Sequence, residues 1–470
     1  SDLTMFRIIA NVFSIPELRN KILFTLGMLA VYRIGYWVTL PGINTEALTS
    51  YFSAAGGTSS AAGKAAAFVA MFAGGSLSQA TIFGLGIMPY ISASIIFQIL
   101  TAVSPNLKKI QEEGPTGRQK IMEWTRYATL ALCVFQGAGY LMFISGSGIG
   151  GVDAQWVRNP IWWVTAISML TAGTMFLMWL GEQIDRHGIG NGVSLIITAG
   201  IITAMPSAFM WLFENFNPGD PNKLDWMSII LLALGFVGVI MGAVLMTVAQ
   251  RRIPVQQAKH TRGRRVFGGQ RSYLPLRVNH SGVMPVIFAS SLMIFPQIAI
   301  QGLAEQMRAA GSTGWFTGSL AWLAGSLTNG QFLFVLLEAI LIFFFSYVWI
   351  TIQFNPEEMS KQLKEHGSFI PGLRPGPRTA EYLEAVMERI TFVGAGMLVI
   401  IALLPQVIAS SMRIDWSVAQ FLGGTGLLIC VSVCLDLLQR IEANLLMRNY
   451  AGFLGGDDAS NAPRIRGPRG

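Results

Sequence analysis

The sequence predicts an all-α polytopic membrane protein with ten transmembrane helices, and three observations support this. Of the 470 residues, 52% are hydrophobic and only 12% are charged, whereas a soluble domain has about 25% charged residues. Ten apolar windows are long enough to cross roughly 30 Å of hydrocarbon. The basic residues gather in alternate loops. A single soluble core could not bury so many apolar segments, so the chain is expected to lie in a bilayer.

The ten expected spans follow one another along the whole chain. They run near 22–40, 79–101, 122–145, 159–181, 190–212, 226–249, 282–303, 331–352, 390–410 and 415–437. Because their number is even, both termini are expected on the same side of the membrane. Residues 1–21 and 438–470 would form the terminal segments on that side.

The distribution of basic residues predicts which side this is. Most of the 33 Lys and Arg residues lie in the two terminal segments or in the loops 102–126, 182–189, 250–281 and 353–389. The six that lie elsewhere are Arg33, Lys64, Arg158, Lys223, Arg308 and Arg413. Cytoplasmic loops carry an excess of Lys and Arg, so these loops and both termini are expected in the cytoplasm.

Two of these loops have features that charge alone does not explain. Loop 250–281 has no Asp or Glu, and a hairpin is expected around Ile253–Gln257 and Arg264–Phe267. Loop 353–389 combines a charged helix, Glu357–His366, with a turn rich in Pro and Gly that would hold Arg374 on a stiff tip. Membrane orientation would account for the charges but not for the stiffness. Since rigid, exposed loops often carry function, we predict that both loops dock a cytosolic partner.

The external segment 41–78 is rich in Gly, Ala and Ser and contains one short apolar run, Ala65–Phe72. Eight residues cannot cross a bilayer, but they can form about two helical turns. Gly74 and Gly75 would end such a helix. The segment is therefore either an ordinary surface loop or a small re-entrant helix, which would need protein or water around it.

Catalytic and cofactor motifs are not found in the sequence. It has no metal-ligand spacing, no Walker-type phosphate loop and no nucleophile elbow, so we expect no enzymatic activity, metal or cofactor. An ion-coupled transporter of a small solute is the alternative function, for which Arg33 and Glu338 would be the intramembrane ionisable residues. Glu338 lies near the outer end of its span and is expected to reach the membrane interface.

Two stretches carry a family resemblance. The first is Gly84–Gln98 (GLGIMPYISASIIFQ), and the second is Gly173–Ile184 (GTMFLMWLGEQI), continuing through Gly188–Ser194 (GIGNGVS). Both resemble the signature segments of the SecY/Sec61α family of protein-conducting channels, in the expected order. Further matches are Gly282–Pro285, Phe354–Pro356, Pro371–Gly376 and Gly423–Thr425. The resemblance covers nearly the whole chain and is strongest to the bacterial form.

The resemblance implies a clamshell of two inverted pseudo-symmetric halves. Residues 22–212 would hold spans one to five and residues 226–437 spans six to ten, joined by an external hinge loop at 213–225. A short plug helix at about 65–76 would fill the external funnel. Its residues would be Ala65, Phe68, Met71, Phe72, Gly74 and Gly75, with the two glycines as a hinge.

The resemblance also implies how the pore closes and where it opens sideways. A ring of aliphatic side chains would seal the pore by excluding water; its members would be Ile87, Ile91, Val193, Ile197, Ile287 and Ile429. A lateral gate would open between spans two and three and spans seven and eight, where Pro89 and Pro285 would help the helices bend. Gln98, Asn191 and Asn279 would form a polar cluster near the gate, although Asn191 could instead bond only to nearby backbone.

The implied function is that of the pore-forming subunit of the Sec translocon in the bacterial inner membrane. Unfolded polypeptides with a signal sequence would cross through it, and nascent transmembrane segments would leave sideways among the lipids. The implied partners are the SecE and SecG subunits, the SecA motor and the ribosome. Docking of the motor and the ribosome would use Arg251, Arg252, Arg264, Arg265 and Arg374.

Overall fold

The computed structural model describes residues 16–48, 80–145, 151–217, 225–257, 260–262, 265–267, 271–280, 282–309, 314–327, 331–411 and 425–455. Within these residues, five helices are long and apolar enough to cross a membrane, and a sixth span results if one bent helix pair is counted. The predicted plug at 65–76 lies outside the described residues.

Each predicted span overlaps one long helix in the described part of the chain. The first five are α2 (Pro16–Gly35), α6 (Met88–Val103), α8 (Pro115–Ile144), α10 (Pro160–His187) and α11 (Gly192–Glu214). The second five are α12 (Trp226–Val248), α13 (Met284–Ala309), α15 (Phe332–Gln353), α17 (Pro377–Ser411) and α19 (Thr425–Gly455).

Several helix ends differ from the predicted span ends. Helix α17 begins at Pro377 rather than near residue 390, because its first turns bury Leu383 and Met387 against other parts of the protein instead of lipid. Helix α6 begins at Met88 rather than near residue 79, after a run of turns over residues 82–87. Hydropathy detects the apolar part of a segment and cannot distinguish turns from helix within it.

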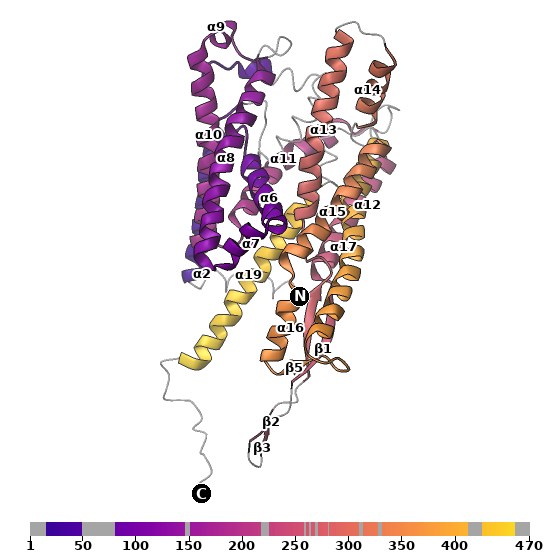
Figure 1. The fold of residues 1–470 in the computed structure, drawn as a ribbon. Coiled ribbons are helices and arrows are strands. Elements are labelled where there is room, and N and C mark those ends of the chain that lie inside the picture. The colour runs from indigo at the N-terminus through magenta and orange to yellow at the C-terminus, as the bar shows by residue number, and fades with distance from the viewer. Residues whose placement is uncertain are drawn as a thin grey trace.

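The helices form two groups (Figure 1). In the first half α8 packs against α6 and α10, and in the second half α15 packs against α13 and α17. The halves meet where α11 packs on α19 and where α6 reaches α15. The chain therefore has two helical blocks with contacts on two sides of a shared centre, as the clamshell prediction requires.

A small sheet and several short helices extend from one end of the bundle. Strand β1 (Gln250–Gln257) pairs antiparallel with β4 (Arg271–Arg277), and β5 (Ser368–Phe369) joins the other edge of β1. Strands β2 (His260–Arg262) and β3 (Arg265–Phe267) pair farther out. These strands lie at the same end as α7 (Pro105–Glu112) and α16 (Pro356–Glu365), whereas α9 (Ala154–Val157) and α14 (Trp315–Ser326) lie at the opposite end (Figure 1). The predicted charged helix is confirmed, and the loop does form a hairpin, but the expected pairing is wrong: residues 253–256 pair with β4, and Arg265–Phe267 pairs with β2.

The sheet is fixed to the bundle by its own apolar cluster. Ile253 and Leu276 are buried against Leu383 and Met387 of α17, together with Ile350 of α15. Fully burying one such side chain contributes about 1.5–3 kcal/mol. The strands are thus anchored to the bundle at their base, and they project from its end (Figure 1).

Candidate functional site

The six predicted ring residues all belong to, or pack against, one large buried apolar cluster inside the bundle. Five are buried members of one large apolar cluster, and Val193 is partly buried against the same cluster. They come from four helices, two in each half: Ile87 and Ile91 from the start of α6, Val193 and Ile197 from α11, Ile287 from α13 and Ile429 from α19. Ile87 is 0% exposed and Ile429 is 1% exposed. Both halves therefore contribute predicted ring residues to this cluster, and their role as a pore constriction stays a prediction.

Ile87 reaches the centre because the chain turns before α6 begins. The amide of Gly84 donates to Thr81 O over 2.9 Å and that of Gly86 to Phe83 O over 2.8 Å. Gly86 has φ +57°, a left-handed conformation that costs glycine little. Ile87 is the N-cap of α6, and Pro89 lies in the first turn of that helix.

The expectation that Pro89 and Pro285 interrupt their helices is wrong. Pro89 lies in the first turn of α6 and Pro285 is the second residue of α13. Proline is well tolerated at these positions, because the first amide groups of a helix have no intrahelical acceptor. The prolines inside helices are instead Pro206 in α11, Pro296 in α13 and Pro405 in α17.

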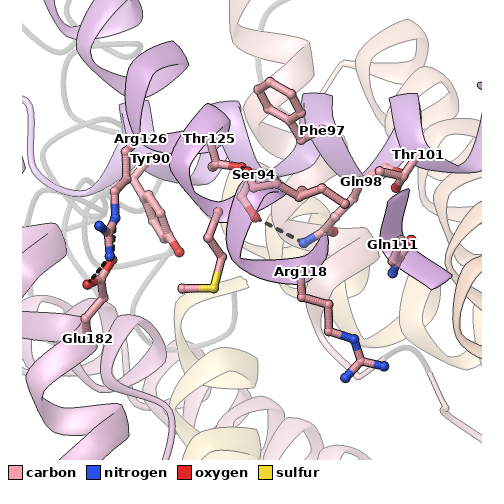
Figure 2. Close-up of a pocket in the computed structure, with 12 residues that line it drawn as sticks. Tyr90, Ser94, Phe97, Gln98, Thr101, Gln111, Arg118, Thr125, Arg126 and Glu182 are labelled. Atoms are coloured by element: carbon pink, nitrogen blue, oxygen red, sulfur yellow. Dashed lines mark hydrogen bonds and ion pairs between the residues drawn. The ribbon is translucent and has the colours of Figure 1, made fainter. Parts of the chain in front are cut away.

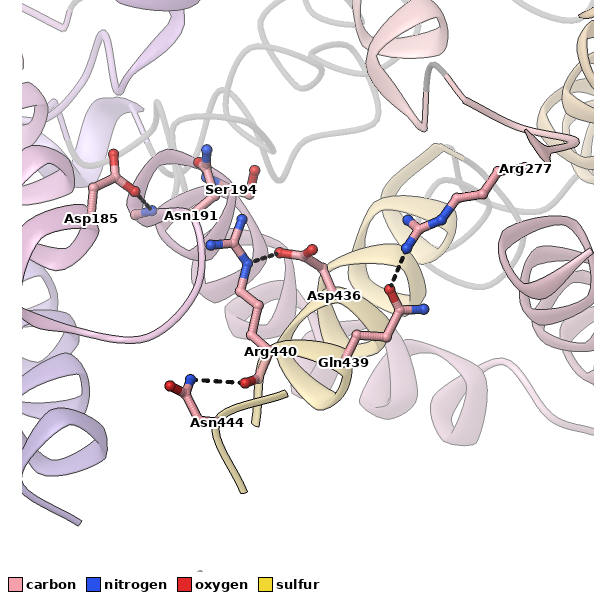
Figure 3. Close-up of polar contacts among 9 residues, drawn as sticks. Asp185, Asn191, Ser194, Arg277, Asp436, Gln439, Arg440 and Asn444 are labelled. Atoms are coloured by element: carbon pink, nitrogen blue, oxygen red, sulfur yellow. Dashed lines mark hydrogen bonds and ion pairs between the residues drawn. The ribbon is translucent and has the colours of Figure 1, made fainter. Parts of the chain in front are cut away.

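Helix α11 is held tightly against the end of α10. A Cβ atom built on Gly192 would collide with the backbone oxygen of Gly181. Asp185 Oδ1 accepts from the Gly192 amide over 2.7 Å, and Asn191 Oδ1 accepts from the Ser194 amide over 3.0 Å (Figure 3). Asn191 therefore caps α11, which confirms the local backbone contact. These contacts set the position of the two ring residues on α11.

The three predicted gate polar residues make local hydrogen bonds. Gln98 Nε2 donates to Ser94 Oγ over 3.0 Å, one turn earlier on α6. Asn279 is buried, and its Nδ2 donates to Gly282 O over 2.9 Å in the turn before α13. Gln98 alone among the three lines a cavity between α6 and α8. Each of the three residues thus makes its own local hydrogen bond. That they form one polar cluster stays a prediction.

The sequence reasoning missed an ion pair that joins α8 to α10. Arg126 Nη2 lies 2.7 Å from Glu182 Oε2 and 2.8 Å from Oε1, and Arg126 Nε donates to Oε1 over 3.1 Å (Figure 2). The Glu182 side chain is 17% exposed and that of Arg126 37%. Glu182 belongs to the second signature segment. A carboxylate at the end of an apolar span could have indicated from the sequence that a basic partner lies nearby.

Replacing Glu182 by alanine is expected to destabilise the protein by about 2 kcal/mol. The change leaves the Arg126 guanidinium unpaired in a partly buried position, which costs more than an exposed pair contributes. Thermal unfolding of the purified protein in detergent measures the effect.

Asp436→Ala is the matched control. It removes an exposed pair with Arg440, one turn apart on α19, with an N–O distance of 2.8 Å, and such pairs contribute about 0.3–0.5 kcal/mol. Equal losses of stability in the two variants would contradict a structural role for the Arg126–Glu182 pair.

The predicted docking residues lie on the projecting end of the molecule. Arg374 is exposed, and its carbonyl oxygen accepts from Thr379 Oγ1 over 2.9 Å. Ser360 Oγ donates to Gly376 O over 2.8 Å and so ties the same turn to α16. Arg251 and Arg252 are exposed on β1. Arg265 lies in β3, and Arg264 lies outside the described residues.

Glu338 corrects one expectation. Its side chain is 1% exposed and packs inside the protein on the buried face of α15, so it does not reach the interface as predicted. Its Oε2 atom is buried without a hydrogen-bond partner within the described residues. An apolar window shows how deep a residue lies along its helix, but not which neighbouring helix covers it.

Known proteins resemble this chain over nearly its full length. Residues 81–438 match the SecY family model. "Protein translocase subunit SecY" of Chlamydia trachomatis is 40% identical, with 96% of this chain and 99% of the relative covered. The Escherichia coli K12 protein of the same name is 41% identical over 93% of this chain and 94% of the relative.

Solved structures share the fold. One described as "The structure of a protein conducting channel" matches with a TM-score of 0.60 and 17% identity over 94% of each chain. Sec61 in the canine ribosome-channel complex matches with a TM-score of 0.56 and 16% identity over 94% of each chain. Because the family model matches residues 81–438 and its curated relatives are matched over nearly their full length, the chain belongs to the SecY family.

Proposed function

We propose that the chain is the pore-forming subunit of a bacterial protein translocon, which conducts unfolded polypeptides across the inner membrane. One observation supports the proposal: six aliphatic side chains from both halves belong to, or pack against, the same large apolar cluster of a polytopic helix bundle. A collar of this kind excludes water and ions. Its branched side chains can rotate aside for a polypeptide, which has no fixed shape of its own.

The packing supports a sideways opening between α6 and α8 on one side and α13 and α15 on the other. Across this boundary α6 reaches α15, while on the other side of the pore α11 packs on α19. A signal sequence would enter between α6 and the second half, and separation of these helices would open the ring. Apolar segments would then partition into lipid.

The proposed partners bind at the end that carries the hairpin. We assign this end to the cytoplasm because most Lys and Arg residues gather in its loops. Arg251, Arg252, Arg264, Arg265 and Arg374 would dock the SecA motor and the ribosome, and SecE and SecG would complete the complex. Ribosomal RNA would offer phosphates to these cations, so docking should weaken with salt.

Arg374→Glu tests the function and the docking site together. Liposomes that contain the chain with SecE and SecG receive SecA, ATP and an unfolded preprotein, and protease-protected preprotein is measured. The charge reversal on a braced tip is expected to lower protection at least about tenfold, since like-charge contacts at an interface cost several kcal/mol.

Arg378→Glu is the matched control, because Arg378 is also exposed and lies four residues away, on α17. It should retain most of the activity. If the assembled wild-type complex protects no preprotein with a motor from the same organism, the export function is wrong. Solute transport would then be tested next, with Glu338 as the first residue to change.

A further inference from the structure

A polar cavity lies between α6, α7, α8 and α10 (Figure 2). Its volume is about 180 Å³, well below the roughly 300–1,000 Å³ of a typical small-molecule pocket. Its polar lining includes Ser94, Gln98, Arg118, Arg126 and Glu182. A space of this size suits one small polar group rather than a folded ligand or a long peptide.

The cavity lies where the helices leave the bilayer. Helices α6 and α7 are bent by 105° relative to each other at a short break, and residues of both line the cavity. On α8, Trp124 is 39% exposed and Tyr127 is 71% exposed. Trp and Tyr favour the headgroup level of a membrane, so the cavity lies at the depth of lipid headgroups.

One wall offers a hydrogen-bond acceptor that has no partner. Gln98 Oε1 is buried and unsatisfied within the described residues, while Gln98 Nε2 donates to Ser94 Oγ over 3.0 Å. In this orientation of the amide, its oxygen has no hydrogen-bond partner among the described residues. A buried acceptor without a partner is costly, so a ligand that brings an N–H or O–H group would be favoured.

The charges of the cavity favour a phosphate. Arg126 and Glu182 neutralise each other as an ion pair. Arg118 is exposed and lines the cavity, and no carboxylate of the described residues lies within ion-pair distance of it. The lining thus has one net positive charge, on a guanidinium that binds phosphate well.

We propose that this cavity binds the headgroup of a membrane phospholipid. Its phosphate meets Arg118, and its terminal hydroxyl or ammonium group donates to Gln98 Oε1. Phosphatidylglycerol and phosphatidylethanolamine carry such a donor, whereas the trimethylammonium of phosphatidylcholine does not. The basic leading end of a signal sequence fits less well, because Arg118 repels it.

Native mass spectrometry of the purified full-length chain with its co-purified partners tests the proposal. The protein is titrated with phosphatidylglycerol, phosphatidylethanolamine and phosphatidylcholine that have identical acyl chains. The two donor-bearing lipids are expected to bind about fivefold more tightly than phosphatidylcholine, as one hydrogen bond allows. Gln98→Leu should reduce this ratio to about one, because the acceptor is lost.

Two further variants separate the contributions. Arg118→Gln should weaken binding of all three lipids about fivefold and leave their ratio unchanged, because each has a phosphate. Gln98→Glu keeps an acceptor and adds a negative charge, so it should shift the preference from phosphatidylglycerol to phosphatidylethanolamine. Lys109→Gln, an equal loss of charge on α7 outside the cavity lining, should change nothing.

The outcomes that overturn the proposal are distinct. Equal binding of the three lipids by the wild type would show that the cavity does not distinguish their headgroups. An unchanged ratio of donor-bearing lipid to phosphatidylcholine binding in Gln98→Leu would show the same. Equally tight binding of glycerophosphoglycerol, which lacks acyl chains, would assign the cavity to a soluble phosphate compound. Displacement of lipid by a basic signal peptide in the wild type but not in Gln98→Leu would assign it to the transported chain.

Discussion

Gly192→Val is expected to destabilise the protein by about 3 kcal/mol or more, toward the upper end of what overpacking costs. A Cβ atom at Gly192 would meet the backbone oxygen of Gly181 and would lie 2.8 Å from Gly181 C and Cα. Backbone cannot rotate away as the end of a long side chain can. Helix α11 would have to shift, and it carries Val193 and Ile197 of the ring. Unfolding in detergent and the yield of assembled complex measure the loss.

Gly238→Val on α12 separates this collision from the general effect of placing valine in a helix. A Cβ atom there would meet nothing within 4 Å, and valine is a slightly better helix former than glycine. This variant should be as stable as the wild type. Comparable losses in the two variants would refute the claim that contact between α10 and α11 positions the ring.

The double variant Ile91→Gly, Ile197→Gly is expected to raise the ion conductance of the resting channel at least about tenfold, because a wider and less apolar constriction no longer excludes water. The two side chains come from different helices, α6 and α11, and are 7% and 3% exposed. Their removal opens the collar from two directions. Single-channel recording in planar bilayers measures the conductance.

Ile202→Gly is the control for this result. Ile202 lies on α11 five residues after Ile197, but it is 49% exposed and lies outside the buried apolar cluster. The substitution weakens the helix by about the same amount, roughly 0.5–1 kcal/mol. If Ile202→Gly leaks as much as the double variant, the leak comes from helix weakening and the assigned ring is wrong.

The spans could be predicted because the bilayer imposes a length and a polarity that the sequence must satisfy. Several of their ends could not: α17 begins well before its apolar window, and α19 ends well beyond its own. Helix α19 continues to Gly455 through charged residues such as Asp436 and Arg440. Those residues stabilise the helix by local pairing, which a hydropathy window does not detect.

The ring residues were predicted from the family resemblance, and the structure places all six at one apolar cluster. The Arg126–Glu182 pair was missed, because it joins positions 56 residues apart on two helices. Helical periodicity shows which face each side chain occupies, but not which faces meet. Because the sequence does not show which helix faces meet, the burial of Glu338 inside the protein was also not predicted.

The hairpin described above also has a mechanical consequence. Strand β4 ends at Arg277 and α13 begins at Met284, three residues before Ile287. The turn between them is braced, because the Val278 amide donates to Ala249 O over 2.9 Å. The hairpin can thus act as a lever. Its strand β4 has seven residues and is about 23 Å long. The base of this lever lies close in sequence to Ile287, one of the predicted ring residues. We therefore expect a load applied at the far end of this arm to act as a torque on the first turn of α13.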